Sequence, residues 1–351
     1  MVPALSTGTG MEADRAHVLA RTEAVWRELK GARLLITGGT GFVGSWMLEA
    51  LRWANTDLAA GVSAVVLTRN PEEFNRQRPH LAVARGVRLH RGDVRTFDIP
   101  AESFTHVIHG AASADAALYA SEPLAMLDTI VAGTRRTLEC AVASKASTVL
   151  LVSSGAVYGR QRLDVANVHE DYTGSPDVLD PGQVYAEGKR AAEMMGAVVA
   201  KQSGINTKIA RLFAFVGPYL PLDRHLAVGN FIRDRLAGGP IAIKGDGSPL
   251  RSYLYGSDLA IWLWTILVRG VSCRPYNVGS DRPLSIAEVA QVVADAVPPS
   301  VPVTRAREPR PSVPSERYVP DTSRARTELG LEDWVGLEEG VRRTLAWAGA
   351  Q

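Results

Sequence analysis

The stretch LLITGGTGFVG, residues 34–44, decides the fold. It places Gly38, Gly41 and Gly44 directly after an apolar run and directly before a segment of helical periodicity. In such a context the first glycine permits a tight turn, the second lets the backbone approach a pyrophosphate, and the third lets helix and strand pack closely. The free N–H groups and the helix dipole favour negative phosphates there. The contacts predicted for a bound dinucleotide are Gly38, Thr40, Gly41, Phe42, Val43 and Gly44.

Short apolar runs alternate with helical stretches on both sides of this turn. Such alternation predicts an α/β fold of the Rossmann type, a doubly wound parallel sheet with helices on both faces. The predicted strands are 33–37, 63–68, 87–90, 106–109, 148–152 and 206–212. The predicted helices are 12–30, 42–53, 124–144, 184–202, 258–268 and 286–297.

The pattern of predicted strands, helices and turn residues divides the chain into three parts. Residues 1–30 form a tail and an accessory helix, which is expected to pack on the body of the protein, although it could cap a sheet edge or serve a partner. Residues 31–217 form the dinucleotide-binding domain. Beyond residue 217 proline and glycine become frequent, so 218–351 is expected to be mainly a smaller, discontinuous α/β substrate lobe, with some segments returning to the first domain. Within it, 305–320 is predicted to be an extended loop.

Composition excludes several classes of function. Apolar residues make up 46% and charged residues 22% of the 351 residues, and the formal net charge is +2, which gives no case for nucleic acid or an anionic membrane surface. The two cysteines, Cys140 and Cys273, have neither disulfide-framework nor metal-site spacing and are expected to be reduced thiols. No apolar run approaches the roughly 18 residues of a membrane span, and no signal-peptide pattern opens the chain. We expect a soluble, cytoplasmic protein without a metal.

The ends of the next strands indicate how the cofactor is chosen. An acidic residue after the second strand would favour NAD, whereas Arg69 stands there and could accommodate a 2′-phosphate, so NADP is slightly favoured over NAD. Asp93, followed by Val94, is placed to accept from the adenine amino group. Ala111 and Ala112 follow the fourth strand, where small residues allow close passage of the nicotinamide ribose.

A catalytic group is predicted from two further segments. Tyr185 and Lys189 are four residues apart, so on a helix they share one face. A nearby ammonium is expected to lower the pKa of the phenol, which could then exchange a proton with a sugar hydroxyl while a hydride passes to nicotinamide. Ser154, just after the fifth strand, would bind and orient the same oxygen.

With these motifs in order, the chain resembles the extended short-chain dehydrogenases, the NAD-dependent epimerase/dehydratase family. The resemblance covers about residue 31 to near the C-terminus. The motifs that carry it are TGGTGFVG at 37–44, Asp93-Val94, HGAA at 109–112, SSGAVYG at 153–159, Tyr185-x-x-x-Lys189, ARLFAFVGP at 210–218, RSYLYGSD at 251–258 and Asn277-Val278-Gly279.

The resemblance implies a role for each matching residue. Tyr185 is the general base, Lys189 its partner and a ligand of the cofactor ribose, and Ser154 the hydroxyl that orients the substrate. Arg251 matches the arginine that meets the nucleotide diphosphate, and Asn230 lies where the family closes over the nucleotide. Further candidate substrate contacts are Arg224, His225 and Arg317. The family also implies a homodimer formed through the helices 124–144 and 184–202.

Three departures from the family pattern bear on the reaction. Sugar 4,6-dehydratases carry an acid pair directly after the catalytic serine or threonine, and decarboxylating relatives usually keep the glutamate; here Gly155 and Ala156 stand there and cannot ionise. Ile130 replaces an asparagine of the dimer helix and removes an expected hydrogen bond near the cofactor. Arg69 replaces the acidic residue of NAD-bound epimerases.

These observations favour a nucleotide-sugar epimerase that works through a transient 4-keto-sugar, because Tyr185 could serve both half-reactions without an acid pair. The alternative is an NADPH-dependent reductase of a 4-keto-6-deoxy nucleotide sugar, which suits Arg69 better. A dehydratase with another acid comes third. A non-catalytic nucleotide-binding scaffold is least favoured, since Tyr185, Lys189 and Ser154 are all present.

Overall fold

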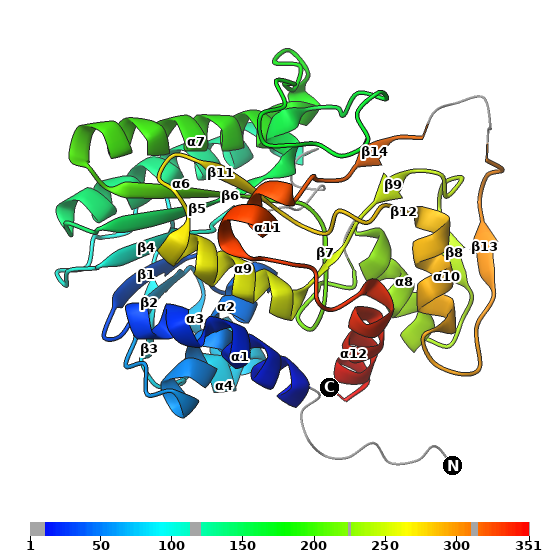
Figure 1. The fold of residues 1–351 in the computed structure, drawn as a ribbon, viewed down its shortest axis with the longest axis horizontal. Helices are drawn as coiled ribbons and strands as arrows, with labels where there is room; N and C mark the ends of the chain where they lie inside the picture. Colours follow the sequence, from blue (N-terminus) through cyan, green and yellow to red (C-terminus); the bar gives the residue numbers. More distant parts are fainter. Residues whose placement is uncertain (1–10, 113–120, 224–225, 310–314, 351) are drawn as a thin grey trace.

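A seven-stranded parallel sheet forms the centre of the protein in this computed structural model, which describes residues 11–112, 121–223, 226–309 and 315–350 (Figure 1). Its order is β3-β2-β1-β4-β5-β6-β11, and the doubly wound fold predicted from the sequence is confirmed. The strands are β1 (Arg33–Thr37), β2 (Ser63–Thr68), β3 (Val87–Arg91), β4 (His106–His109), β5 (Thr148–Ser154), β6 (Asn206–Leu212) and β11 (Pro275–Val278).

Helices cover both faces of this sheet (Figure 1). On one face lie α6 (Pro123–Ala143) and α7 (Val184–Ser203); on the other lie α2 (Phe42–Asp57) and α9 (Gly256–Arg269), with α1 (Glu12–Glu28) packed outside α2 and α9. α9 is buried on almost all sides, which explains its near-continuous apolar sequence. The first helix therefore adds a layer to a face of the sheet and does not cap an edge. Within the described chain, no helix is long and apolar enough to cross a membrane.

A smaller lobe of short elements stands beside the C-terminal ends of the strands (Figure 1). It contains three small sheets: β7 (Phe215–Val216) with β10 (Leu254–Tyr255), β8 (Ile241–Ile243) with β13 (Val303–Arg305), and β9 (Leu250–Arg251) between β12 (Leu284–Ser285) and β14 (Arg317–Tyr318). The remaining helices are α3 (Pro71–Gln77), α4 (Pro79–Ala82), α8 (Ala227–Leu236), α10 (Ile286–Asp295), α11 (Ser323–Leu329) and α12 (Leu337–Gly349), with single 3₁₀ turns at Gly155–Tyr158 and Pro181–Gln183.

Two sequence predictions need correction. The segment 305–320 was expected to be an extended loop, but it contains β14, which pairs in parallel with β9. A two-residue strand has too few alternating positions to produce a recognisable pattern. The fifth strand was expected to end at Val152, but it continues to Ser154 because Ser153 and Ser154 pair with the last residues of β6. Ser154 is thus part of the sheet.

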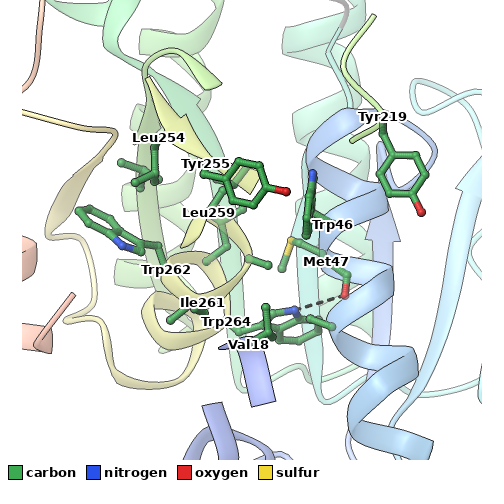
Figure 2. Packing of buried hydrophobic residues seen from close by; sticks show 14 of the residues in the cluster. Val18, Trp46, Met47, Tyr219, Leu254, Tyr255, Leu259, Ile261, Trp262 and Trp264 are labelled. Atoms are coloured by element: carbon green, nitrogen blue, oxygen red, sulfur yellow. Dashed lines mark hydrogen bonds between the residues drawn. The ribbon is translucent and has the colours of Figure 1, made fainter. Parts of the chain in front are cut away.

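Tryptophans fill the core between α2, α9 and α1 (Figure 2). The ring centres of Trp26 and Trp264 lie 4.6 Å apart, and Trp264 Nε1 donates to the Met47 carbonyl at 3.3 Å. Trp46 lies so close to α9 that a Cβ atom on Gly256 would come within 2.1 Å of its ring. Buried aromatic rings of this size contribute much of the core's stability. They fix α2, whose first residues form the glycine-rich turn.

Buried polar groups tie α1 to the C-terminal part of the chain. The Asp14 carboxylate is fully buried and accepts hydrogen bonds from Tyr255 Oη at 2.9 Å and Arg343 Nη1 at 2.6 Å. His17 Nε2 lies 2.6 Å from a carboxylate oxygen of Asp258, which is also buried. Burial raises the pKa of Asp14, and Arg343 opposes that rise. An unpaired charge at this depth would be costly, so Arg343 holds the first helix and the last helix together.

Candidate active site

The glycine-rich turn at the end of β1 has no room for side chains. Gly38 has φ +73°, and a Cβ atom on it would lie 2.4 Å from the carbonyl carbon of Gly110. A Cβ atom on Gly44 would lie 2.3 Å from Cα of Gly39. α2 starts at Phe42, and among the described residues no side chain caps it and its first turn holds no acid. The free N–H groups of this turn fit the pyrophosphate of a dinucleotide.

Arg78, which the sequence analysis did not single out, supports this turn. Its Nη1 donates to the Thr40 carbonyl at 2.9 Å, and its guanidinium carbon lies 4.8 Å from the centre of the Tyr219 ring. Burial lowers the pKa of Arg78, but a guanidinium remains charged in proteins. A fixed positive charge therefore lies beside the predicted phosphate site. Only the tertiary fold brings Arg78 there, since it is 38 residues from Thr40.

Charged side chains gather at the ends of β2 and β3, where the adenine and its ribose are expected. Asp93 accepts from Arg95 Nε at 2.9 Å and Arg95 Nη2 at 2.8 Å, and this pairing lowers the pKa of Asp93 to about 2. Its neighbour Val94 is buried. Arg69 is exposed, and its charge also helps to lower the pKa of Asp93. The residue directly after β2 thus carries a guanidinium and not a carboxylate.

Buried hydrogen bonds order the end of β4. The Ala111 N–H donates to Thr37 Oγ1 at 3.3 Å, and Thr37 Oγ1 lies 2.8 Å from His109 Nδ1. His109 Nε2 lies 3.0 Å from Thr134 Oγ1. Burial, together with the charge of Lys189, lowers the pKa of His109 to about 3, so the ring is neutral. Each ring nitrogen meets one threonine hydroxyl, so the neutral ring donates through one nitrogen and accepts at the other. This fixes the backbone that leads to Ala111 and Ala112.

The structure brings Ser154, Tyr185 and Lys189 together. Ser154 ends β5 and is buried, while Tyr185 and Lys189 lie one turn apart in the first part of α7. The Ser154 hydroxyl forms a hydrogen bond with the Tyr185 hydroxyl. Lys189 Nζ donates to the Val152 carbonyl at 2.7 Å and lies 5.7 Å from the centre of the Tyr185 ring. The three side chains therefore lie close together at the C-terminal end of β5.

The expected influence of Lys189 on Tyr185 is not found. Burial raises the pKa of Tyr185, and the hydrogen bond with Ser154 is what opposes the rise. Lys189 does not lower it because its ammonium is directed to the carbonyl of Val152 and lies over the ring. Burial lowers the pKa of Lys189 itself to about 8, while the charge of Glu193 acts to raise it. Ser154 therefore has the larger effect on the phenol.

Glu193 is a second residue that the sequence analysis missed. Its Oε1 accepts from Ser153 Oγ at 2.5 Å, and both carboxylate oxygens accept from Arg211, at 3.0 and 2.7 Å. It lies one helical turn beyond Lys189 on α7. The spacing of four residues after Lys189 was visible in the sequence, but a glutamate on a helix is usually exposed to solvent.

The space beside Ser154 is filled by aromatic side chains. A Cβ atom on Gly155 would lie 2.6 Å from Phe213 Cζ and 2.8 Å from Tyr318 Oη. The rings of Phe213 and Tyr318 are 4.7 Å apart. The Tyr318 hydroxyl forms a hydrogen bond with Ser154, and Tyr318 is half-buried. No sequence motif pointed to Tyr318, although its neighbour Arg317 was considered.

The residues predicted to contact the substrate do not form one cluster, unlike Ser154, Tyr185 and Lys189. Arg251 Nη2 is paired with Glu316 at 2.7 Å, and its guanidinium carbon lies 6.0 Å from the centre of the Tyr318 ring. Asn230 lies on α8 and accepts from Arg233 Nη1 at 3.1 Å. Arg317 Nη1 donates to the Ala166 carbonyl at 3.3 Å. Arg224 and His225 lie outside the described residues.

Ile130, where the resemblance led us to expect an asparagine, makes only apolar contacts among the described residues. It is buried in an apolar cluster with Met126 and Ala192, against which Tyr185 and Ala112 pack. A Cβ atom on Gly188 would lie 3.1 Å from Ile130 Cδ1, so α6 and α7 are in close contact here. Apolar packing thus supports Tyr185 from this position.

Known proteins resemble this chain over most of its length. The model of the NAD dependent epimerase/dehydratase family matches residues 34–279. UDP-glucuronic acid decarboxylase 1 of Danio rerio is 31% identical over 90% of this chain and 72% of its own length. Among solved structures, UDP-glucose 4-epimerase from Thermotoga maritima has a TM-score of 0.74 at 22% identity, covering 90% of this chain and 98% of that one. UDP-glucuronic acid 4-epimerase from Bacillus cereus, solved with NAD, has a TM-score of 0.75 at 22% identity, covering 90% and 98%.

Proposed function

Because the chain belongs to the NAD dependent epimerase/dehydratase family, we propose that it is a nucleotide-sugar epimerase. In the proposed reaction, the 4-hydroxyl of the sugar is oxidised to a transient ketone, and reduction from the opposite face gives the epimer. When bound, NAD or NADP supplies the hydride acceptor and donor. The glycine-rich turn would hold its pyrophosphate and Lys189 its nicotinamide ribose.

The chain's own residues would move the proton and orient the oxygen. Tyr185 would accept the proton of the sugar hydroxyl on oxidation and return it on reduction. Ser154 would hold the same oxygen next to Tyr185, as its hydrogen bond with the phenol allows. Lys189, whose ammonium is directed to the Val152 carbonyl, would act on the cofactor ribose with its charge. Arg251 and Asn230 are the proposed contacts of the nucleotide.

The filled space at Gly155 is the observation that carries this proposal. A dehydratase needs an acid and a base beside the catalytic hydroxyl to eliminate water, and Gly155 and Ala156 cannot ionise. Phe213 and Tyr318 already occupy the volume that a side chain at Gly155 would take. The hydroxyls of Ser154, Tyr185 and Tyr318 remain, and they suit the exchange of one proton with one oxygen.

The test is to follow product and cofactor together. The purified protein is denatured, any released nicotinamide is identified by mass spectrometry, and UDP-, dTDP- and GDP-linked hexoses and hexuronates are incubated with the native protein without added cofactor. We expect an isomer of unchanged mass, without deuterium at C4 in heavy water, because the hydride returns from within the enzyme. Loss of water or of carbon dioxide would instead identify a dehydratase or a decarboxylase.

A reductase of a 4-keto-6-deoxy nucleotide sugar is the second candidate, and Arg69 favours it. A guanidinium at the end of β2, where NAD enzymes carry an acid, suits the 2′-phosphate of NADPH. A reductase would release its oxidised cofactor each cycle, so it would show turnover only with added NADPH and a keto-sugar. Replacing Arg69 by alanine should then weaken NADPH binding and leave NADH binding unchanged.

We also propose a homodimer formed through α6 and α7. The two helices pack against each other, and Leu124, Met194 and Val198 on them are exposed apolar side chains. Light scattering during size-exclusion chromatography should give twice the chain mass. Replacing Met194 and Val198 by glutamate should give a monomer.

A further inference from the structure

We propose that Tyr318 is a positioning residue of the catalytic group: its hydroxyl donates to Ser154 and thereby turns the Ser154 proton toward Tyr185. The inference rests on the proposed role of Tyr185 as the base. Tyr318 lies on β14 of the small lobe, whereas Ser154, Tyr185 and Lys189 lie on β5 and α7 of the Rossmann domain.

Three observations place Tyr318 beside the hydroxyls of Ser154 and Tyr185. Its hydroxyl forms a hydrogen bond with Ser154. The same oxygen lies 2.8 Å from where a Cβ atom of Gly155 would be, so it occupies the position next to the catalytic serine. Its electrostatic interaction with Tyr185 shows that the two phenols are close.

Tyr318 is held rigidly at this point. β14 pairs with β9, so that Tyr318 lies opposite Arg251, and the Leu250 N–H donates to the Glu316 carbonyl at 2.8 Å. The ring also packs against Phe213, with centres 4.7 Å apart and planes inclined by 38°. The hydroxyl therefore has a fixed direction, which a positioning role requires.

The hydrogen-bonding capacity of Ser154 fixes the direction of each bond. A serine hydroxyl has one proton and two acceptor positions. The Ala156 N–H, at 3.1 Å, takes one acceptor position. Before substrate binds, a phenolate at Tyr185 can only accept, so the Ser154 proton goes to Tyr185 and the remaining acceptor position takes the proton of Tyr318. The chain then runs from Tyr318 through Ser154 to Tyr185. When the sugar oxygen binds, the Ser154 proton turns to that oxygen.

An ionised Tyr185 favours a protonated Tyr318, because, in addition to burial, the charge of Tyr185 raises the pKa of Tyr318. Burial raises the pKa of Tyr318, and the hydrogen bond with Ser154 opposes that rise only in part. A chain of aligned hydrogen bonds polarises each member, so donation from Tyr318 strengthens the bond from Ser154 to the phenolate. Donation from Tyr318 through Ser154 thus stabilises the Tyr185 phenolate, which is the effect that was expected of the Lys189 ammonium.

The test compares two tyrosine-to-phenylalanine variants. Tyr318→Phe removes one hydroxyl and keeps the ring. Tyr276→Phe is the matched control, because the Tyr276 hydroxyl bonds to Glu328 at 2.9 Å, away from the catalytic group. We expect Tyr318→Phe to lower turnover at neutral pH by about tenfold, the worth of one such hydrogen bond. The acidic limb of its pH profile should move to higher pH, whereas Tyr276→Phe should keep the parent profile.

Ionisation of Tyr185 can be measured without any substrate. In protein labelled with ¹³C at tyrosine Cζ, the resonance that disappears in Tyr185→Phe reports this phenol. Its titration midpoint should be higher in Tyr318→Phe than in the parent and unchanged in Tyr276→Phe. Thermal unfolding of each variant separates this effect from loss of the fold.

A double-mutant cycle tests whether Tyr318 acts through Ser154. If it does, adding Tyr318→Phe to Ser154→Ala lowers turnover no further than Ser154→Ala alone. Additive losses, or an unchanged midpoint for Tyr185, would overturn the proposal. Because the titration needs no turnover, an enzyme that is not an epimerase can still confirm or refute the role of Tyr318.

Discussion

The Tyr185 hydroxyl is the one atom through which the proposed proton transfer must pass. Tyr185→Phe removes it and leaves the packing of the ring against Ile130 and Ala192 in place. We expect turnover to fall by about 100- to 10,000-fold, the usual contribution of a positioned acid–base group. Binding of the nicotinamide cofactor, followed by calorimetry, should be unchanged. Retained turnover would eliminate Tyr185 as the base.

Glu193 sets the pH range over which Lys189 stays charged. Burial lowers the pKa of Lys189 to about 8, and Glu193 acts against this lowering. Lys189 is charged below that value and neutral above it, so activity should decline on the alkaline side. Glu193→Gln removes the opposing charge and should move this decline to lower pH in a profile of kcat. Glu187→Gln, on the same helix with only a 3.7 Å contact to Arg190, should leave the profile unchanged.

Individual residues were predictable where local spacing sets their positions. Ser154, Tyr185 and Lys189 follow from a strand end and a helical period, and the structure places them together. Tyr318 was not predictable, because only the pairing of β14 with β9 brings it to Ser154. The direction of the Lys189 ammonium depends on the Val152 carbonyl, which no sequence pattern locates.

At the scale of elements, the turn between β1 and α2 can be tested with two glycines of equal conformation. Gly38 has φ +73° and faces the backbone of Gly110 at 2.4 Å, whereas Gly31 has φ +72° and nothing within 4 Å. Gly31→Ala should cost only about 1 kcal/mol of unfolding free energy, for the left-handed backbone. Gly38→Ala must also displace backbone.

We therefore expect Gly38→Ala to lose cofactor binding and Gly31→Ala to keep it. Urea unfolding and calorimetric titration with NAD and NADP measure the two effects separately. Equal binding by both variants would mean that the turn does not hold the pyrophosphate.

Elements were predictable mainly in the first two thirds of the chain. Six of the seven strands of the main sheet and the helices α6, α7 and α9 lie within a few residues of their predicted bounds, whereas β11, α8 and α12 were not predicted. The two- and three-residue strands of the small lobe offer no period, and β14 was accordingly missed. That lobe is where the substrate contacts are proposed.

At the scale of the whole molecule, Asp14 joins the first helix to the last one. Arg343→Met leaves a fully buried carboxylate without its cation and should cost about 3 kcal/mol of unfolding free energy. Arg342→Met removes only a pair with Glu339 in which the arginine is 57% exposed, so little change is expected. Urea unfolding at neutral pH compares them.

The loss in Arg343→Met should also depend on pH. The folded pKa of Asp14 is raised by burial, and removing Arg343 raises it further. The folded variant therefore binds a proton more readily than the unfolded chain, and its deficit should shrink as the pH falls toward the range in which Asp14 is protonated. A deficit independent of pH would show that Arg343 acts through packing alone.

The same contact has a consequence for how the protein is made. Asp14 leaves the ribosome before Tyr255 and Arg343, which follow 241 and 329 residues later. Until then its carboxylate stays hydrated, because burial without Arg343 is unfavourable. The first helix should therefore pack less firmly on α9 until α12 has been synthesised. A chain that stops before α12 would lack Arg343. Its first helix would then be held less firmly and would be more accessible to quality-control proteases.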